Sequence, residues 1–163
     1  MLMGMKAIVA VDEAWGIGKD GSLLFSIPED MRFFRQTTAG HTVVMGRETL
    51  RSLPGGRPLP KRDNIVLSRD PSFSPEGVRV ARSLGELAAM LGDEQTVYVM
   101  GGESVYRQLL PYCEEALVTR VAASRPADRH FPALEEQPGW TLVGAEPVQS
   151  ETGLSITFCR YRN

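Results

Sequence analysis

The sequence predicts an α/β fold in a single domain that spans residues 1–163. Short apolar runs recur along the chain without alternating with polar residues, a pattern typical of strands buried on both faces. Stretches with helical spacing lie between these runs. Strands that alternate with helices favour a parallel sheet covered on both faces. Near the C-terminus two extended runs follow each other without a helix, which predicts an antiparallel addition to the sheet.

Five runs are predicted strands, at residues 7–11, 42–45, 64–67, 96–100 and 116–119. Four stretches are predicted helices, at residues 28–37, 47–53, 84–91 and 104–110. The first helix begins at Pro28, which suits a first turn, and has two acids near the positive end of the helix dipole. The third has apolar residues three and four apart and ends at Gly92. Residues 140–148 and 155–161 predict a C-terminal hairpin.

The composition is that of an ordinary globular protein, with 42% hydrophobic and 23% charged residues and a formal net charge of −2. This charge does not predict a nucleic-acid partner, and no apolar run is long enough to cross a membrane. The two cysteines are far apart, and the two histidines are too scattered for a zinc site. We therefore expect a reduced, cytoplasmic protein without a metal.

Residues 16–21, Gly-Ile-Gly-Lys-Asp-Gly, match the glycine spacing of a dinucleotide-binding fingerprint. That motif requires a helix to open at the glycines, whereas no helix begins here before Ile27 or Pro28. We therefore reject the fingerprint and expect a mobile glycine-rich loop of about ten residues beside the first strand. An ordinary surface turn is the alternative.

Residues at three predicted strand ends suit a phosphate ligand. In residues 100–104, Met-Gly-Gly-Glu-Ser, paired glycines let the backbone approach a ligand and a helix follows. Residues 45–49 contain Arg47, and Ser68 and Arg69 follow another strand. Together they can hold a dianionic phosphate, such as the 2′-phosphate that distinguishes NADPH from NADH. The alternatives are a tight turn and solvated arginines.

Asp30 shares one face of the first predicted helix with Ile27 and Phe34. An acid on an apolar face is costly without a partner, and a ligand with two adjacent donors can supply one. From the pattern alone, the favoured interpretation is that Asp30 complements the helix dipole. The loop from Arg57 to Arg62 can likewise bind an anionic substrate tail or be a solvated basic loop.

In this order and spacing, the motifs resemble dihydrofolate reductases of the bacterial chromosomal type, from about Lys6 to Tyr161. The resemblance is carried by residues 7–12, 15–18, 27–30, 33–34, 44–47, 57–60, 64–68, 100–102 and 130–132. It implies a mostly parallel sheet of about eight strands with an antiparallel C-terminal strand. It also implies a monomer that reduces dihydrofolate with NADPH and binds antifolate inhibitors.

The resemblance assigns the substrate residues. Asp30 is expected to bind N3 and the 2-amino group of the pterin, with support from Thr119. The pterin and benzoyl pocket is expected to be lined by Ile8, Met31, Phe34, Leu53 and Met100. Arg62 is expected to hold the α-carboxylate of the glutamate tail, with Arg57 nearby.

The resemblance also assigns the NADPH residues. Those expected near the nicotinamide and its ribose are Ala10, Gly16, Ile17, Gly18, Lys19, Asp20, Gly21 and Ser22. Those expected at the adenosine and phosphates are Gly46, Arg47, Glu48, Thr49, Ser68, Arg69 and Arg82. Those expected to cradle the pyrophosphate and nicotinamide are Gly101, Gly102, Glu103, Ser104, Val105 and Tyr106.

The implied reaction transfers a hydride to C6 of dihydrofolate and a proton to N5. Asp30 faces the opposite edge of the pterin, so we expect it to orient the ring and favour its protonated form, while water delivers the proton. The chain departs from the family at residues 23–25, which read Leu-Leu-Phe where Leu-Pro-Trp is common. Phe25 lacks the indole N–H with which a tryptophan would hold a water molecule. Leu24 lacks the backbone restraint of proline, so we expect loop closure to differ in rate or population. The alternatives are the pyrimidine reductase of riboflavin synthesis and a non-catalytic NADPH-binding regulator, and neither has a use for Asp30.

Overall fold

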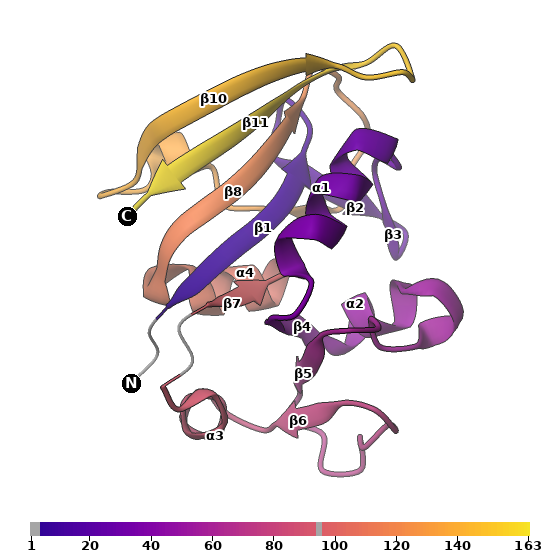
Figure 1. Ribbon diagram of the computed structural model, residues 1–163, viewed down its shortest axis with the longest axis vertical. Helices are drawn as coiled ribbons and strands as arrows, with labels where there is room; N and C mark the ends of the chain where they lie inside the picture. Colours follow the sequence, from indigo (N-terminus) through magenta and orange to yellow (C-terminus); the bar gives the residue numbers. More distant parts are fainter. Residues whose placement is uncertain (1–3, 94–95) are drawn as a thin grey trace.

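A computed structural model describes residues 4–93 and 96–163 (Figure 1). The α/β prediction is confirmed, with one eight-stranded sheet in the order β10-β11-β8-β1-β7-β4-β5-β6. Its strands are β1 (Met5–Val11), β4 (Thr42–Gly46), β5 (Asp63–Leu67), β6 (Arg79–Ala81), β7 (Val97–Val99), β8 (Cys113–Val121), β10 (Thr141–Gln149) and β11 (Ser155–Arg162). All pairs from β8 to β6 are parallel. The predicted antiparallel strand is β11, which pairs with β8 and β10.

The four predicted helices are present as α1 (Pro28–Thr38), α2 (Arg47–Ser52), α3 (Leu84–Leu91) and α4 (Glu103–Leu109). The Ser83 hydroxyl caps α3 by accepting from the Glu86 N–H, which fixes the start of this helix. Four ends differ from the prediction by one residue, namely the end of α1, the end of α2 and both ends of α4. Helix α4 starts earlier because Gly102 is its N-cap, and α2 stops earlier because Leu53 is already extended. Within the described ranges, no helix is long and apolar enough to span a membrane.

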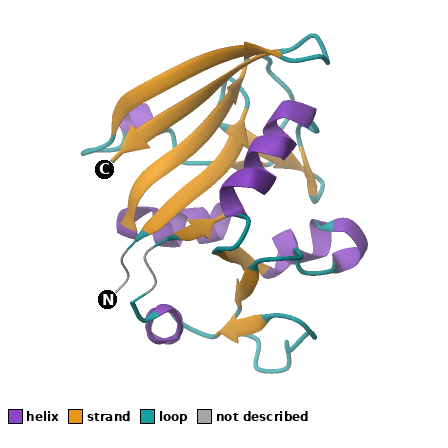
Figure 2. Ribbon diagram, viewed as in Figure 1, coloured by secondary structure: helices purple, strands orange, loops and turns teal. Residues whose placement is uncertain are grey.

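Alternate residues of β4 belong to two separate hydrophobic cores, one on each face of the sheet. Val43 and Met45 pack with Leu50 of α2 and with two aromatic residues of α1. Val44 packs on the other side with Leu87 of α3 and with apolar residues of α4. Side chains of a strand point alternately to opposite faces, so one apolar run serves both cores. The helices therefore cover both faces of the sheet, as predicted (Figure 2).

The glycine-rich segment is a hairpin, which corrects the expectation of a loop. It consists of β2 (Gly16–Lys19) and β3 (Ser22–Leu23), and β9 (Arg129–His130) completes a second sheet in the order β3-β2-β9. The turn residues Asp20 and Gly21 have φ angles of 51° and 79°, the left-handed values that a two-residue hairpin turn requires. No helix opens at the glycines, so rejecting the fingerprint was correct.

Truncation of Leu87 tests the packing of α3. Leu87 is 0% exposed, and Leu87→Ala is expected to lower the free energy of unfolding by about 2–5 kcal/mol through lost burial and a cavity. Leu142→Ala on β10, where the leucine is 50% exposed, is the matched control and is expected to cost less than about 1 kcal/mol. Urea unfolding of the two variants measures the difference, and equal losses would contradict this account of the core.

Candidate active site

Asp30 is bound to a residue 89 positions away in the sequence. The hydroxyl of Thr119, on β8, donates a hydrogen bond of 2.6 Å to Oδ1 of Asp30 in the first turn of α1. Thr119 is 2% exposed. One step further along both elements, Ile27 and Val121 pack in a shared apolar cluster. The helix therefore meets the strand through two successive contacts, one apolar and one polar.

Burial dominates the electrostatics of Asp30. Desolvation raises the pKa of its carboxyl above the ordinary value of 3.8, and the hydrogen bond from Thr119 opposes this rise. Asp30 makes no capping bond, since the N-cap of α1 is Ile27 and has no side-chain partner. The interpretation that Asp30 mainly complements the helix dipole is therefore replaced: Asp30 is a partly buried acid that Thr119 of β8 holds by a hydrogen bond.

Four of the five predicted pocket residues lie in one apolar cluster. Ile8 is buried there, and its partly buried neighbours include Phe34, Leu53 and Met100. Met31 lies outside this cluster with 51% of its surface exposed, and its sulfur accepts a hydrogen bond from Ser26. These contacts form an apolar surface beside the acid, with Met31 at its margin.

The basic loop is held rigidly around Arg62. Its guanidinium donates to the Thr38 hydroxyl at 3.0 Å and to the carbonyls of Pro60 and Arg35 at 2.7 and 2.8 Å. Asn64, 3% exposed, exchanges hydrogen bonds with the Leu59 backbone and so fixes the same loop. Its buried amide is a contribution that the sequence did not reveal. Arg57 is exposed.

The glycines of two predicted phosphate motifs meet at the carboxyl ends of β4 and β7. The N–H of Gly46 donates to the carbonyl of Gly101 at 2.8 Å. Gly101 has a φ of +135°, and a Cβ there would come within 3.0 Å of the Thr49 hydroxyl. A side chain at this position would be strained by the φ angle and crowded by Thr49, so the position favours glycine. This cradle fits the phosphates of a dinucleotide such as NADPH.

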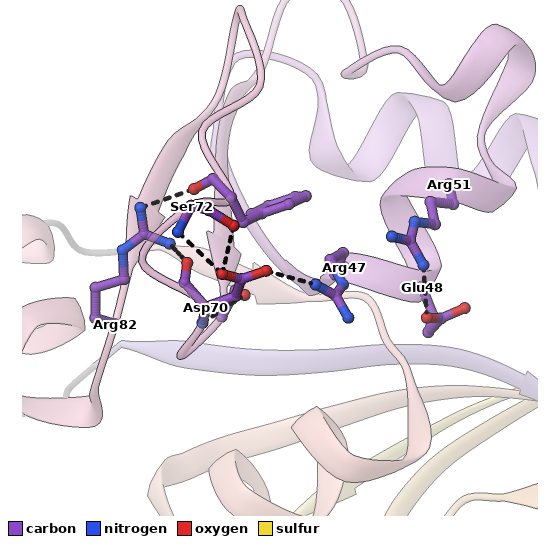
Figure 3. A network of polar contacts seen from close by, with 8 residues as sticks. Arg47, Glu48, Arg51, Asp70, Ser72 and Arg82 are labelled. Atoms are coloured by element: carbon purple, nitrogen blue, oxygen red, sulfur yellow. Dashed lines mark hydrogen bonds and ion pairs between the residues drawn. The ribbon is translucent and has the colours of Figure 1, made fainter.

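The arginines beside the cradle are not equivalent (Figure 3). Arg47 and Arg82 approach the Asp70 loop from opposite sides, and Arg47 Nη1 lies 3.2 Å from Asp70 Oδ2. Arg82 donates to the backbone carbonyls of Asp70 and Phe73, so it holds the loop itself. Hydrogen bonds from Ser72, and then the charges of Arg47 and Arg82, keep the pKa of Asp70 below its ordinary range. A phosphate at this edge therefore meets two arginines and an ionised acid.

Other predicted cofactor residues differ in their surroundings. Ala10 pairs with Thr119 in the sheet, which places it beside Asp30. Tyr106 is buried and its hydroxyl donates to the Ile8 carbonyl at 2.7 Å, while Glu103 accepts from the His130 N–H. The buried members of the hairpin are Gly16, Ile17 and Gly18, and the exposed members are Lys19, Asp20, Gly21 and Ser22. Of the remaining predicted phosphate residues, Glu48 pairs with Arg51, Arg69 is exposed, and Ser68, Ser104 and Val105 lie at the same strand ends.

Two opposed shifts on α1 predict how stability depends on pH. The pKa of Asp30 is raised by burial, so its contribution to stability is present below the ordinary pKa and is lost as pH rises through the folded value. Asp30→Asn removes this loss, and its stability relative to the wild type should increase from about pH 3 to pH 7. Glu29→Gln should show the opposite trend, because hydrogen bonds from Glu151 and Ser150 lower the pKa of Glu29. Denaturant unfolding across this range tests both, and parallel trends would contradict the burial of Asp30.

Comparison with known proteins places this geometry in a family. The profile of the dihydrofolate reductase family matches residues 4–163. A dihydrofolate reductase from Mycobacterium leprae is 50% identical over 150 residues, which cover 90% of this chain and 87% of that protein. One from Bacillus subtilis is 37% identical over 139 residues, covering 85% and 81%.

A solved structure gives the same answer at the level of the fold. The dihydrofolate reductase of Enterococcus faecalis, complexed with NADP(H) and RAB-propyl, matches with a TM-score of 0.88 at 33% identity. The match covers 99% of this chain and 98% of that one. None of these matches supports the riboflavin-pathway alternative. The chain belongs to the dihydrofolate reductase family.

Proposed function

We propose that this protein reduces 7,8-dihydrofolate to 5,6,7,8-tetrahydrofolate with NADPH. The observation that carries the proposal is Asp30, a partly buried acid that Thr119 holds beside an apolar surface. A protein that only bound NADPH would have no use for such an acid. Membership of the dihydrofolate reductase family supports the same reaction.

Asp30 is proposed to recognise the pterin edge. Oδ1 is occupied by the Thr119 hydroxyl, and among the described residues Oδ2 has no hydrogen-bond partner. A pterin that offers N3–H and the 2-amino group can donate to this carboxylate and satisfy it. Two adjacent donors fix the plane and direction of the ring, because each bond restrains one rotation.

The rest of the site is proposed to set the environment of the reaction. NADPH, when bound, supplies the hydride that C6 of dihydrofolate accepts. The backbones of Gly46, Gly101 and Gly102 suit its phosphates, and Arg47 with Arg69 suits the 2′-phosphate. Ile8, Phe34, Leu53 and Met100 exclude water around the pterin and so strengthen the field of the Asp30 carboxylate.

Asp30 is proposed to act on N5 at a distance. Its negative charge stabilises a protonated pterin, while a water molecule delivers the proton to N5 on the opposite edge. The Arg62 guanidinium, fixed by Thr38 and two carbonyls, is proposed to bind the α-carboxylate of the glutamate tail. Antifolate inhibitors are expected to bind at the same acid.

The enzyme is proposed to work in the cytoplasm as one domain. Cys113 and Cys159 are both buried and unpaired, which suits a reducing compartment. Burial raises the pKa of the Cys113 thiol to about 12, so this group is unreactive at neutral pH.

Replacement of Asp30 tests the proposed reaction. Asp30→Asn is expected to lower turnover of dihydrofolate at neutral pH by about 100-fold or more, because the charge that favours the protonated pterin is lost. NADPH affinity should stay unchanged. The assay follows absorbance at about 340 nm with both substrates, beside a mixture without dihydrofolate.

Glu29→Gln is the matched control, since Glu29 lies in the same turn but binds Ser150 and Glu151 in the connection between β10 and β11. It should retain wild-type turnover per folded molecule. Unchanged turnover in Asp30→Asn, or no activity in the wild type, would sink the assignment.

Asp70 provides a test of the phosphate site. Asp70→Asn removes a negative charge beside Arg47 while keeping an oxygen for its hydrogen bonds. We expect it to tighten NADPH about threefold to tenfold, because a dianionic phosphate meets less repulsion, and to leave NADH affinity unchanged. Fluorescence titration with both cofactors at low and high salt measures this effect. Equal changes for NADPH and NADH would place the 2′-phosphate away from this edge.

A further inference from the structure

An arginine from a loop distant in sequence contacts Leu24 and Phe25, the two residues that depart from the family. Arg125 lies in the loop between β8 and β9, 101 residues from Leu24. Its Nη1 donates to the Leu24 carbonyl at 2.7 Å, and its Cζ lies 4.4 Å from the centre of the Phe25 ring. One guanidinium thus contacts both residues, through a hydrogen bond and a cation–π interaction.

The backbone of Arg125 is fixed from the other side. Its N–H donates to Oδ2 of Asp12 at 3.1 Å, and Asp12 is 1% exposed. The other carboxylate oxygen of Asp12 accepts from the N–H groups of Ala14 and Gly16 at 2.9 and 2.7 Å. A further bond joins the Glu13 N–H to the Ala123 carbonyl at 3.0 Å. The backbone of Arg125 is therefore fixed to the residues that follow β1, and its side chain extends from there to Leu24 and Phe25.

Gly16 shows how tightly these segments meet. A Cβ on Gly16 would lie 2.8 Å from Ala127 Cβ and 3.1 Å from both Asp12 Oδ1 and Leu24 Cδ1. The start of β2, the β8–β9 loop and the Leu24 segment converge on this glycine. Leu24 also donates its N–H to the Ile17 carbonyl at 3.3 Å. The arginine thus acts on a segment that is already closely packed on one side.

Packed residues connect Phe25 to Asp30. Phe25 packs with Ile27 and Val121, the apolar contact between α1 and β8. Ile27 is the N-cap of α1, three residues before Asp30, and Val121 lies two residues beyond Thr119 on the same face of β8. A displacement of Phe25 therefore acts on the contact next to the Asp30–Thr119 hydrogen bond.

We propose that Arg125 is a positioning residue that holds Leu24 and Phe25 against the start of α1 and so keeps the substrate pocket in shape. A proline at position 24 would restrict the backbone through its ring. Leu24 lacks that restraint, and the arginine supplies one from outside the segment. The inference rests on the proposed function, because substrate affinity is its readout.

Three variants test the role of Arg125. Arg125→Ala removes both contacts, Arg125→Lys keeps the charge without the planar fork, and Phe25→Leu removes the ring. Arg162→Ala is the matched control, since Arg162 is an exposed arginine at the end of β11 that pairs with Glu115 of β8. KM for dihydrofolate, kcat and the melting temperature are measured for each variant. The same quantities are measured for the double variant that combines Arg125→Ala with Phe25→Leu.

We expect Arg125→Ala to raise KM for dihydrofolate about fivefold and to lower kcat/KM about tenfold, because pocket geometry is lost. Arg125→Lys should raise KM less than Arg125→Ala does. Arg125→Ala should lower kcat/KM by a smaller factor in the Phe25→Leu background than in the wild type. KM does not depend on the fraction of folded enzyme, so a purely structural role leaves KM unchanged and only lowers the melting temperature. That result, or strict additivity with Phe25→Leu, overturns the proposal. A wild type without activity would instead refute the proposed function.

Discussion

The hydrogen bond between Thr119 and Asp30 joins the fold to the chemistry. It links the first turn of α1 to Thr119 near the C-terminal end of β8, in register with Ala10 of β1. Holding the acid there has a cost, because burial disfavours its charge and raises its pKa. The surrounding structure offsets this cost through the hydroxyl of Thr119 and the apolar contact of Ile27 with Val121. A folate-reducing enzyme therefore keeps an acid that is poor for stability but suited to a cationic pterin.

Much of the fold was predictable because its signals are local. Continuous apolar runs marked the parallel strands, and Pro28 and Gly92 lie at helix ends as predicted. The strands that were missed, β2, β3, β6 and β9, have two to four residues each. Such short strands exist because of their partners, as when Gly16 pairs with His130 far along the chain. A sequence pattern of two to four residues cannot show a partner of this kind.

The site was predictable to the extent that its motifs have a recognisable order. Asp30 with Thr119, and Gly46 with Gly101, do lie together, whereas Met31 lies outside the apolar cluster. The links through Asp12 and Arg125 were missed, because a single hydrogen bond across about a hundred residues leaves no periodic trace. The buried amide of Asn64, which bonds to the Leu59 backbone within its own loop, was missed as well. The same limit hid the pairing of Arg47 with Asp70, which changes the charge that a phosphate meets.

The most direct test of the central claim is the pKa of Asp30 itself, measured by carbon NMR titration of the carboxyl in the ligand-free protein. The account predicts a value above the ordinary 3.8, since desolvation outweighs the Thr119 hydrogen bond. It also predicts a further rise in Thr119→Val, which removes the bond and keeps the shape of the side chain. A value at or below 3.8 in the wild type, or a fall in the variant, would contradict the account.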